Sequence, residues 1–176
     1  MYFISMIPTK LIKSIFNLLH SNVSPLEIAL GFALGSIIGL TPFFTLHNLF
    51  IFLLLIILNI NFSAGMLGIA VFGLIGYLTD PLAHKIGYLL LVKTKFLEGF
   101  WTSLYNMPIV PFTRFYNTVV LGSLVISLIL FVPIVIGTKK FVVFYRNNLS
   151  KKVEQWKIIK LIKASNIYNL YKKFNP

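Results

Sequence analysis

The 176-residue sequence contains no cysteine. This absence excludes disulfide bonds, thiolate metal sites and thiol nucleophiles, and it leaves the redox environment undetermined. Charged residues are also scarce: they make up 11% of the chain, whereas soluble domains average about 25%. Because 57% of the residues are hydrophobic, the chain is not a typical water-soluble domain, and we expect one membrane-embedded unit.

Acidic residues are the rarer charge, with four Asp and Glu against sixteen Lys and Arg. Most of the resulting net charge of +12 lies in residues 139–176, which contain ten basic residues and one acidic residue. A basic segment directly after an apolar one indicates retention in the cytoplasm and attraction to anionic lipid headgroups. We therefore predict a basic cytoplasmic tail at 147–176, membrane lipids as partners and no nucleic-acid partner.

No Asp, Glu, Lys or Arg occurs from Ile28 to Thr79. Breaks near residues 41 and 60 divide this segment into apolar pieces at about 26–40, 43–58 and 62–78. Each piece is short for a span, which takes about 20 residues. Either all three pieces cross a thin region of the membrane, or the first two form a broken, re-entrant hairpin. Irregular backbone of the second kind requires protein or a water-filled cavity to cover it.

The strongest predicted span is residues 117–137, which carry no charge. Residues 80–116 mix polar and apolar types and are predicted to lie at the interface, with an aromatic belt formed by Trp101, Tyr105, Phe112, Phe115 and Tyr116. Residues 1–25 contain an amphipathic helix at 8–20, expected to lie in the interface rather than to be a cleaved signal peptide. The chain is thus predicted to be an all-α, polytopic helical protein with Gly/Pro-broken short spans, amphipathic terminal helices and a membrane domain at 26–146.

The predicted location is the cytoplasmic (inner) membrane, with several crossings and both termini in the cytoplasm. That orientation requires an even number of full crossings. Four crossings, or two crossings with re-entrant pieces, both satisfy this requirement.

Glycines recur every fourth residue at Gly31, Gly35 and Gly39. Such a ridge lets another helix backbone approach closely in lipid. We expect it to pack within one subunit or across a homo-oligomer.

Two similar polar segments end two of the apolar pieces. Gly39-Leu40-Thr41-Pro42 is followed by His47, and Gly76-Tyr77-Leu78-Thr79-Asp80-Pro81 is followed by His84. Transporters use paired Gly/Pro-interrupted segments to place helix ends at a midplane site, and ionisable residues in a membrane are functional candidates. The alternative is that both segments are ordinary helix ends. The residues predicted to line a polar cavity are Thr41, Pro42, Thr45, His47, Asn48, Thr79, Asp80 and His84.

Motifs for catalysis or cofactor binding do not occur: the sequence has no GxSxG, Walker A, HExxH or GxGxxG pattern. We therefore expect no enzyme activity, no cofactor and no metal site.

The stretches SPLEIALGFALGSIIGLTPFFTLHNLF and LNINFSAGMLGIAVFGLIGYLTDPLAHKIGYLLL resemble a family of bacterial membrane proteins called domain of unknown function 2062. The shared pattern is Ser-Pro, an Ala/Gly-rich segment ending in Gly-x-x-Pro, an apolar helix closed by Asn, and a second Pro-containing break. The family's usual Asn-Pro at that break is Asp80-Pro81 here. The resemblance covers about residues 10–146, including the later stretch LYNMPIVPFTRFYNTVVLGSLVISL, which resembles a longer subgroup.

The family has no established activity, but some relatives are fused to glycosyltransferase domains. The resemblance therefore implies a role near envelope lipid or polysaccharide assembly, with any catalytic partner on a separate envelope protein. The leading hypothesis is a membrane protein that transports or handles an envelope lipid or lipid-linked precursor. The alternative is a non-transporting scaffold that recruits a partner through its basic tail.

Overall fold

The computed structural model describes residues 23–149, and this part of the chain is helical with no β-strand. The α-helices are α2 (Pro25–Leu40), α3 (Leu46–Ile57), α4 (Phe62–Tyr88), α5 (Glu98–Tyr105) and α6 (Thr118–Phe144). Shorter 3-10 or π-helical turns are η1 (Leu89–Lys93), η2 (Lys95–Leu97), η3 (Val110–Thr113) and η4 (Tyr145–Leu149). The all-α prediction is confirmed for these residues. The predicted helix at 8–20 lies outside them, as does the predicted tail beyond residue 149.

The chain divides into two compact units. Residues 23–139 form one unit, which contains α2 to α5 and most of α6. Of the other unit the structure describes residues 140–149, which are the end of α6 and η4. The contacts of α2 with α4 and both grooves consist of residues of the first unit.

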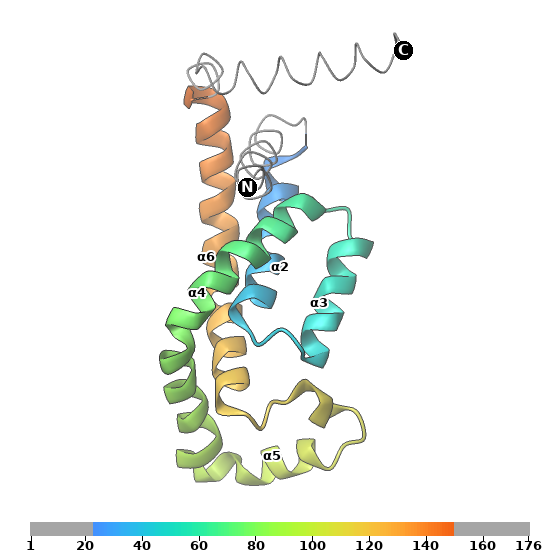
Figure 1. Cartoon of the computed structure of the whole chain (residues 1–176), viewed down its shortest axis with the longest axis vertical. Helices are drawn as coiled ribbons and strands as arrows, with labels where there is room; N and C mark the ends of the chain where they lie inside the picture. The colour runs from blue at the N-terminus through green and yellow to red at the C-terminus, as the bar shows by residue number, and fades with distance from the viewer. Residues whose placement is uncertain (1–22, 150–176) are drawn as a thin grey trace, which may run out of the picture. The chain divides into compact units, whose positions relative to one another are not determined.

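α2 and α3 form an antiparallel hairpin, and α4 then runs back along α2 (Figure 1). The backbone N–H of Asn61 donates to the carbonyl of Glu27 (3.2 Å), so the start of α4 is joined to the start of α2. The Asn61 side chain also caps α4 by accepting from the N–H of Ala64 (2.8 Å). The predicted break near residue 60 is therefore a helix start held against α2.

The glycine ridge of α2 packs against α4. A Cβ atom on Gly35 or Gly39 would collide with backbone atoms of α4, and one on Gly31 would collide with the carbonyl of Asn61, the residue that caps α4. On the opposite side of this contact, a Cβ on Gly68 would collide with the carbonyl of Phe32. The ridge is thus a close backbone contact within one chain, as small residues allow.

A second close contact joins α4 to α6. A Cβ on Gly87 would overlap the carbonyl oxygen of Thr118, and a Cβ on Gly122 would overlap that of Ala83. The ring of His84 lies at the same contact, where its Nδ1 is 2.7 Å from the hydroxyl oxygen of Thr118. Small residues four apart on both helices make this approach possible.

The predicted second break, at Thr79-Asp80-Pro81, is wrong, because α4 continues through these residues to Tyr88. Pro81 has no N–H and cannot donate to the carbonyl of Tyr77, which weakens the helix at this point without ending it. α4 changes direction along its length (Figure 1), and a proline inside a helix is a known cause of such bending. The apolar piece predicted to end at residue 78 thus continues as one helix into the segment predicted to lie at the interface.

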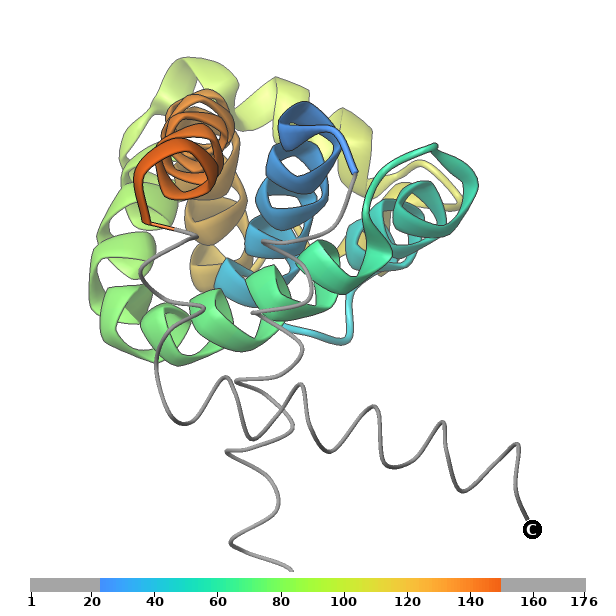
Figure 2. The same cartoon turned by 90° about the horizontal axis from the view of Figure 1, so that it is seen from above.

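The two short helices differ in burial. Viewed from above, α2 lies in the middle and α3 at the outer edge (Figure 2). Nine of the sixteen residues of α2 are buried, whereas α3 buries only Asn48 and Leu55. Six of the other apolar side chains of α3 are exposed: Leu49, Phe50, Leu53, Leu54, Ile56 and Ile57. A contiguous apolar face of this kind is typical of a surface that contacts lipid or another protein.

Aromatic side chains join α5 to the segment just before α6. The indole of Trp101 stacks on the ring of Phe115 (5.8 Å between centroids), and Tyr105 packs edge-on against Tyr116 (5.6 Å). The Trp101 Nε1–H donates to the carbonyl of Leu90 in η1 (2.9 Å). Four of the five predicted belt residues therefore lie in one cluster, which fixes α5 across the ends of the long helices.

Candidate functional site

The turn between α2 and α3, residues 41–45, is the irregular backbone from which the site is built. α2 ends at Leu40 because the residue before a proline is disfavoured in the helical region, and Thr41 accordingly has extended angles (φ −99°, ψ 152°). The N–H and the hydroxyl of Thr41 both approach the carbonyl of Ile37, at 3.1 and 2.8 Å. The first predicted break therefore exists.

The carboxamide of Asn48 holds this turn from inside. Its Nδ2 donates to the carbonyls of Pro42 (3.0 Å) and Phe43 (3.3 Å), and its Oδ1 lies 2.8 Å from the hydroxyl of Thr41. Asn48 is 3% exposed. One buried side chain therefore supplies hydrogen bonds to two turn carbonyls, which would otherwise need water as a donor. This arrangement allows irregular backbone to lie in an apolar environment.

Thr45 and His47 complete the polar cluster. The Thr45 hydroxyl approaches the carbonyl of Pro42 (3.3 Å) and the Nε2 of His47 (3.1 Å). The Nδ1 of His47 is buried and has no hydrogen-bond partner within residues 23–149. The turn thus brings together five predicted cavity residues: Thr41, Pro42, Thr45, His47 and Asn48.

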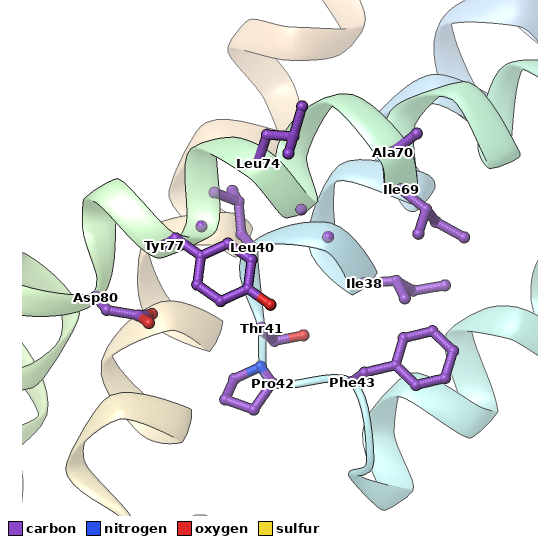
Figure 3. A pocket seen from close by; sticks show the side chains of 13 residues that line it. Ile38, Leu40, Thr41, Pro42, Phe43, Ile69, Ala70, Leu74, Tyr77 and Asp80 are labelled. Atoms are coloured by element: carbon purple, nitrogen blue, oxygen red, sulfur yellow. The ribbon is translucent and has the colours of Figure 1, made fainter. Parts of the chain in front are cut away.

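A groove of 510 Å³ lies beside the turn, between the end of α2 and the middle of α4. Its lining is polar on one side, at Tyr77 and Asp80, with Thr41 between that side and the apolar one (Figure 3). The apolar side consists of Ile38, Phe43, Ile69 and Ala70. Gly39, Gly73 and Gly76 also line the groove and leave room for it. A groove with a polar side and an apolar side is suited to an amphiphilic ligand, which also has a polar part and an apolar part.

A second groove, of 500 Å³, lies on the other side of the turn and is almost wholly apolar. Ile38 and Phe43 line both grooves, and Phe112 of η3 closes the second one. Turn residues therefore separate a groove with a polar side from one suited to apolar chains alone.

Two predicted cavity residues lie elsewhere. The hydroxyl of Thr79 donates back to the carbonyl of Gly76 in its own helix (3.1 Å). His84 lies at the contact of α4 with α6, next to Thr118. Neither residue lines the groove. Because α4 is continuous, residues three and four apart share a face, so Asp80 joins Tyr77 and Gly76 rather than Thr79.

Tyr77 was not among the predicted site residues, although it lines the groove beside Asp80. The signal in the sequence was the spacing of Gly73, Gly76, Tyr77 and Asp80 at three or four residues, which places them on one face of a helix that does not break. The contact through Gly87 and Gly122 was missed for the same reason, because the helix was expected to end before it.

Two helical stretches, Phe62–Lys93 and Thr118–Leu149, are long and apolar enough to cross a membrane. The class defined by the described residues is therefore an all-helical protein with two candidate membrane-spanning helices. Residues 9–150 match the family described as an uncharacterised protein conserved in bacteria (DUF2062), and the chain belongs to this family.

A relative from Treponema pallidum (strain Nichols), itself described as an uncharacterised protein, is 27% identical over 150 residues. This match covers 85% of the chain and 92% of the relative. No solved structure matches the chain.

Proposed function

We propose that the protein is embedded in the cytoplasmic membrane with two crossings, α4 continued by η1 and α6, and a re-entrant hairpin formed by α2 and α3. Phe62–Lys93 has 32 residues, about 48 Å of helix, which exceeds the roughly 30 Å of a hydrocarbon core. α2 and α3 have 16 and 12 residues, about 24 and 18 Å, and are too short to cross.

The level of the turn supports this arrangement over crossings by α2 and α3. A Cβ on Gly76 would lie 2.9 Å from the carbonyl oxygen of Gly39, so the end of α2 lies level with Gly76. From Gly76, α4 and η1 continue to Lys93. A turn beside the middle of a spanning helix lies at mid-depth, where Asn48 supplies the hydrogen bonds that lipid does not.

Labelling of single cysteines in the cysteine-free chain tests this arrangement. Phe96 is 84% exposed and Phe44 is 80% exposed, so both positions accept a thiol. In spheroplasts we expect a membrane-impermeant maleimide to label Phe96→Cys and to leave Phe44→Cys unlabelled, even after permeabilisation. Labelling of Phe44→Cys from outside would show that α2 and α3 cross the membrane and would overturn the re-entrant hairpin.

The function that the site supports best is the binding of an envelope lipid or lipid-linked precursor in the groove beside the hairpin. The observation that carries this proposal is the division of the groove into a side with Tyr77 and Asp80 and a side with Ile38 and Ile69. Binding sites for small molecules are mostly apolar, with a few polar groups that fix orientation. The exposed apolar face of α3 gives a lipid chain a path to the second groove.

Gly73 offers a direct test, because a Cβ added there meets no atom within 4 Å and points into open space at the groove. Gly73→Leu fills the groove without disturbing the helix contact. We expect about tenfold less lipid to copurify with this variant, as counted by native mass spectrometry. A lipid chain that shares the groove with the leucine is overpacked, which costs about 1–3 kcal/mol, and 1.4 kcal/mol is a factor of ten. Gly137→Leu is the matched control, because its Cβ is equally free but lies on α6 outside the groove. Equal lipid in both variants would overturn the proposal.

The alternative function, a scaffold acting through the basic tail, depends on residues beyond 149 that lie outside the described part of the chain. It stays a prediction. Deletion of residues 147–176 tests it. The scaffold would be favoured if the shortened protein still retained lipid in the groove but no longer supported the function of the full-length protein in cells.

A further inference from the structure

Asp80 is the acidic group of the groove, and it is half-buried there. Within residues 23–149 it makes no ion pair and no side-chain hydrogen bond with another residue. The nearest basic side chains along α4, those of His84 and Lys85, lie one turn further on and are exposed. A carboxylate placed in an apolar groove is costly unless a positive partner approaches it.

The end of α2 adds further acceptors on the same side. Pro42 cannot donate to the carbonyl of Ile38, and the carbonyls of Ile38, Gly39 and Leu40 accept no hydrogen bond from any residue in the described part of the chain. These three residues line the groove together with Asp80. A helix C-terminus carries a partial negative charge, which favours cations.

Donors are few in the groove by comparison. The hydroxyl of Thr41 is directed to Ile37 and Asn48 within the turn. The hydroxyl of Tyr77, which is 80% exposed, is the remaining side-chain donor that lines the groove in the described residues. A carboxylate and several carbonyls, with one hydroxyl as the side-chain donor, make a site for a group that is positively charged and rich in N–H donors.

We propose that the polar side of the groove binds the primary ammonium group of a lipid headgroup, with Asp80 as its counter-ion. A primary ammonium has three N–H donors, which match the carboxylate of Asp80 and the carbonyls at the end of α2. The hydroxyl of Tyr77 donates to the phosphate that follows in an ethanolamine headgroup. An anionic glycerol headgroup lacks the cation and is repelled by Asp80. This inference rests on the proposed function, because it specifies the lipid held by the same groove.

The test uses the full-length chain, reconstituted with equal amounts of dioleoyl phosphatidylethanolamine and dioleoyl phosphatidylglycerol and then extracted in mild detergent. The ratio of the two retained lipids is measured by native mass spectrometry. We expect roughly tenfold enrichment of phosphatidylethanolamine, because its ammonium makes charge-assisted hydrogen bonds that the glycerol headgroup cannot make. Asp80→Asn should remove this enrichment while the total lipid count stays the same. Glu98→Gln is the matched control on α5, outside the groove, and should keep it.

A third lipid separates charge from hydrogen bonding. Dioleoyl phosphatidylcholine keeps the positive charge but has no N–H donor, so it should be retained less than phosphatidylethanolamine and more than phosphatidylglycerol. Equal retention of all three lipids, or unchanged enrichment in Asp80→Asn, would overturn the headgroup assignment. In either case a lower lipid count in Gly73→Leu than in Gly137→Leu would leave the proposed lipid groove in place, so the two failures are distinguishable.

Discussion

The segments around Pro42 and Pro81 contain the same residue types, yet the backbone leaves the helix at the first and continues through the second. At Pro42 the chain turns and starts α3, and the turn carbonyls are bonded by Asn48. At Pro81 the chain stays helical, and the loss of one hydrogen bond is tolerated. Each segment follows a glycine that contacts the other helix, because Gly39 and Gly76 face each other.

The residue six positions after each proline accounts for the difference. After Pro42 it is Asn48, whose carboxamide replaces the helical hydrogen bonds that the turn gives up. After Pro81 it is Gly87, which has no side chain to offer and packs against the carbonyl of Thr118. A proline thus ends a helix in an apolar environment where another group satisfies the freed backbone, and otherwise the helix continues with a bend.

The largest expected effect comes from placing an asparagine six residues after Pro81, where the segment around Pro42 has Asn48. Gly87→Asn places a Cβ on the carbonyl oxygen of Thr118 and forces α4 and α6 apart. We expect a loss of more than about 3 kcal/mol, seen as a lower yield of folded protein and a lower midpoint of thermal unfolding in detergent. Gly99→Asn, at a position where a Cβ meets nothing within 4 Å, should unfold like the wild type. A fully stable Gly87→Asn would contradict the close contact.

Removing the carboxamide from the first segment should have the next largest effect. Asn48→Leu keeps the size of the side chain but removes the donor of two hydrogen bonds, so the carbonyls of Pro42 and Phe43 keep only their contacts with Thr45. Each lost hydrogen bond costs about 0.5–1.5 kcal/mol, so the two together cost about 1–3 kcal/mol, a fall in melting temperature of roughly 2–12 °C for a chain of this size. Asn59, which is exposed in the loop before α4, provides the control Asn59→Leu. Equal melting temperatures for the two variants would argue against a structural role for Asn48.

The two prolines should respond to alanine with opposite signs. Pro81→Ala restores an N–H to a helix interior, where proline costs up to about 3 kcal/mol, and should raise the melting temperature. Pro42→Ala restores no helical hydrogen bond, because Thr41 is already extended, and it loosens the unfolded chain, so it should lower stability by about 0.4–1 kcal/mol. Thermal unfolding of both variants measures the difference. If both variants shifted the melting temperature in the same direction, the two prolines would have the same structural role, and the contrast between the segments would be wrong.

The smallest expected effects concern the two threonines. Thr41→Val removes a buried hydroxyl that contacts Asn48 and should cost about 1 kcal/mol. Thr79→Val removes a hydroxyl that only bonds back to its own helix, and it should change stability by less than about 0.5 kcal/mol. Comparison of the two melting temperatures checks this order, and a larger loss at Thr79 would reverse the interpretation of the two segments.

Much of the fold was predictable from local sequence. The helical class, the turn at Thr41-Pro42 and the glycine ridge all follow from residues close in the chain, and the structure agrees with each. The break at Pro81 was not predictable in the same way, because whether a proline ends a helix depends on partners distant in sequence. Because α4 continues through Pro81, Tyr77 lines the groove, whereas Thr79 and His84 do not.

The sequence by itself determined that this chain is apolar, helical and lacking in acidic residues, because composition and short-range periodicity fix how much backbone must be hydrogen-bonded internally. Tertiary structure alone decided which helix ends meet. The close approach of α2 to α4 set the level of the turn, and the contact at Gly87 kept α4 continuous past Pro81. The groove depends on that continuity, since it brings Asp80 to the end of α2 through packing between segments about forty residues apart, which no local pattern records.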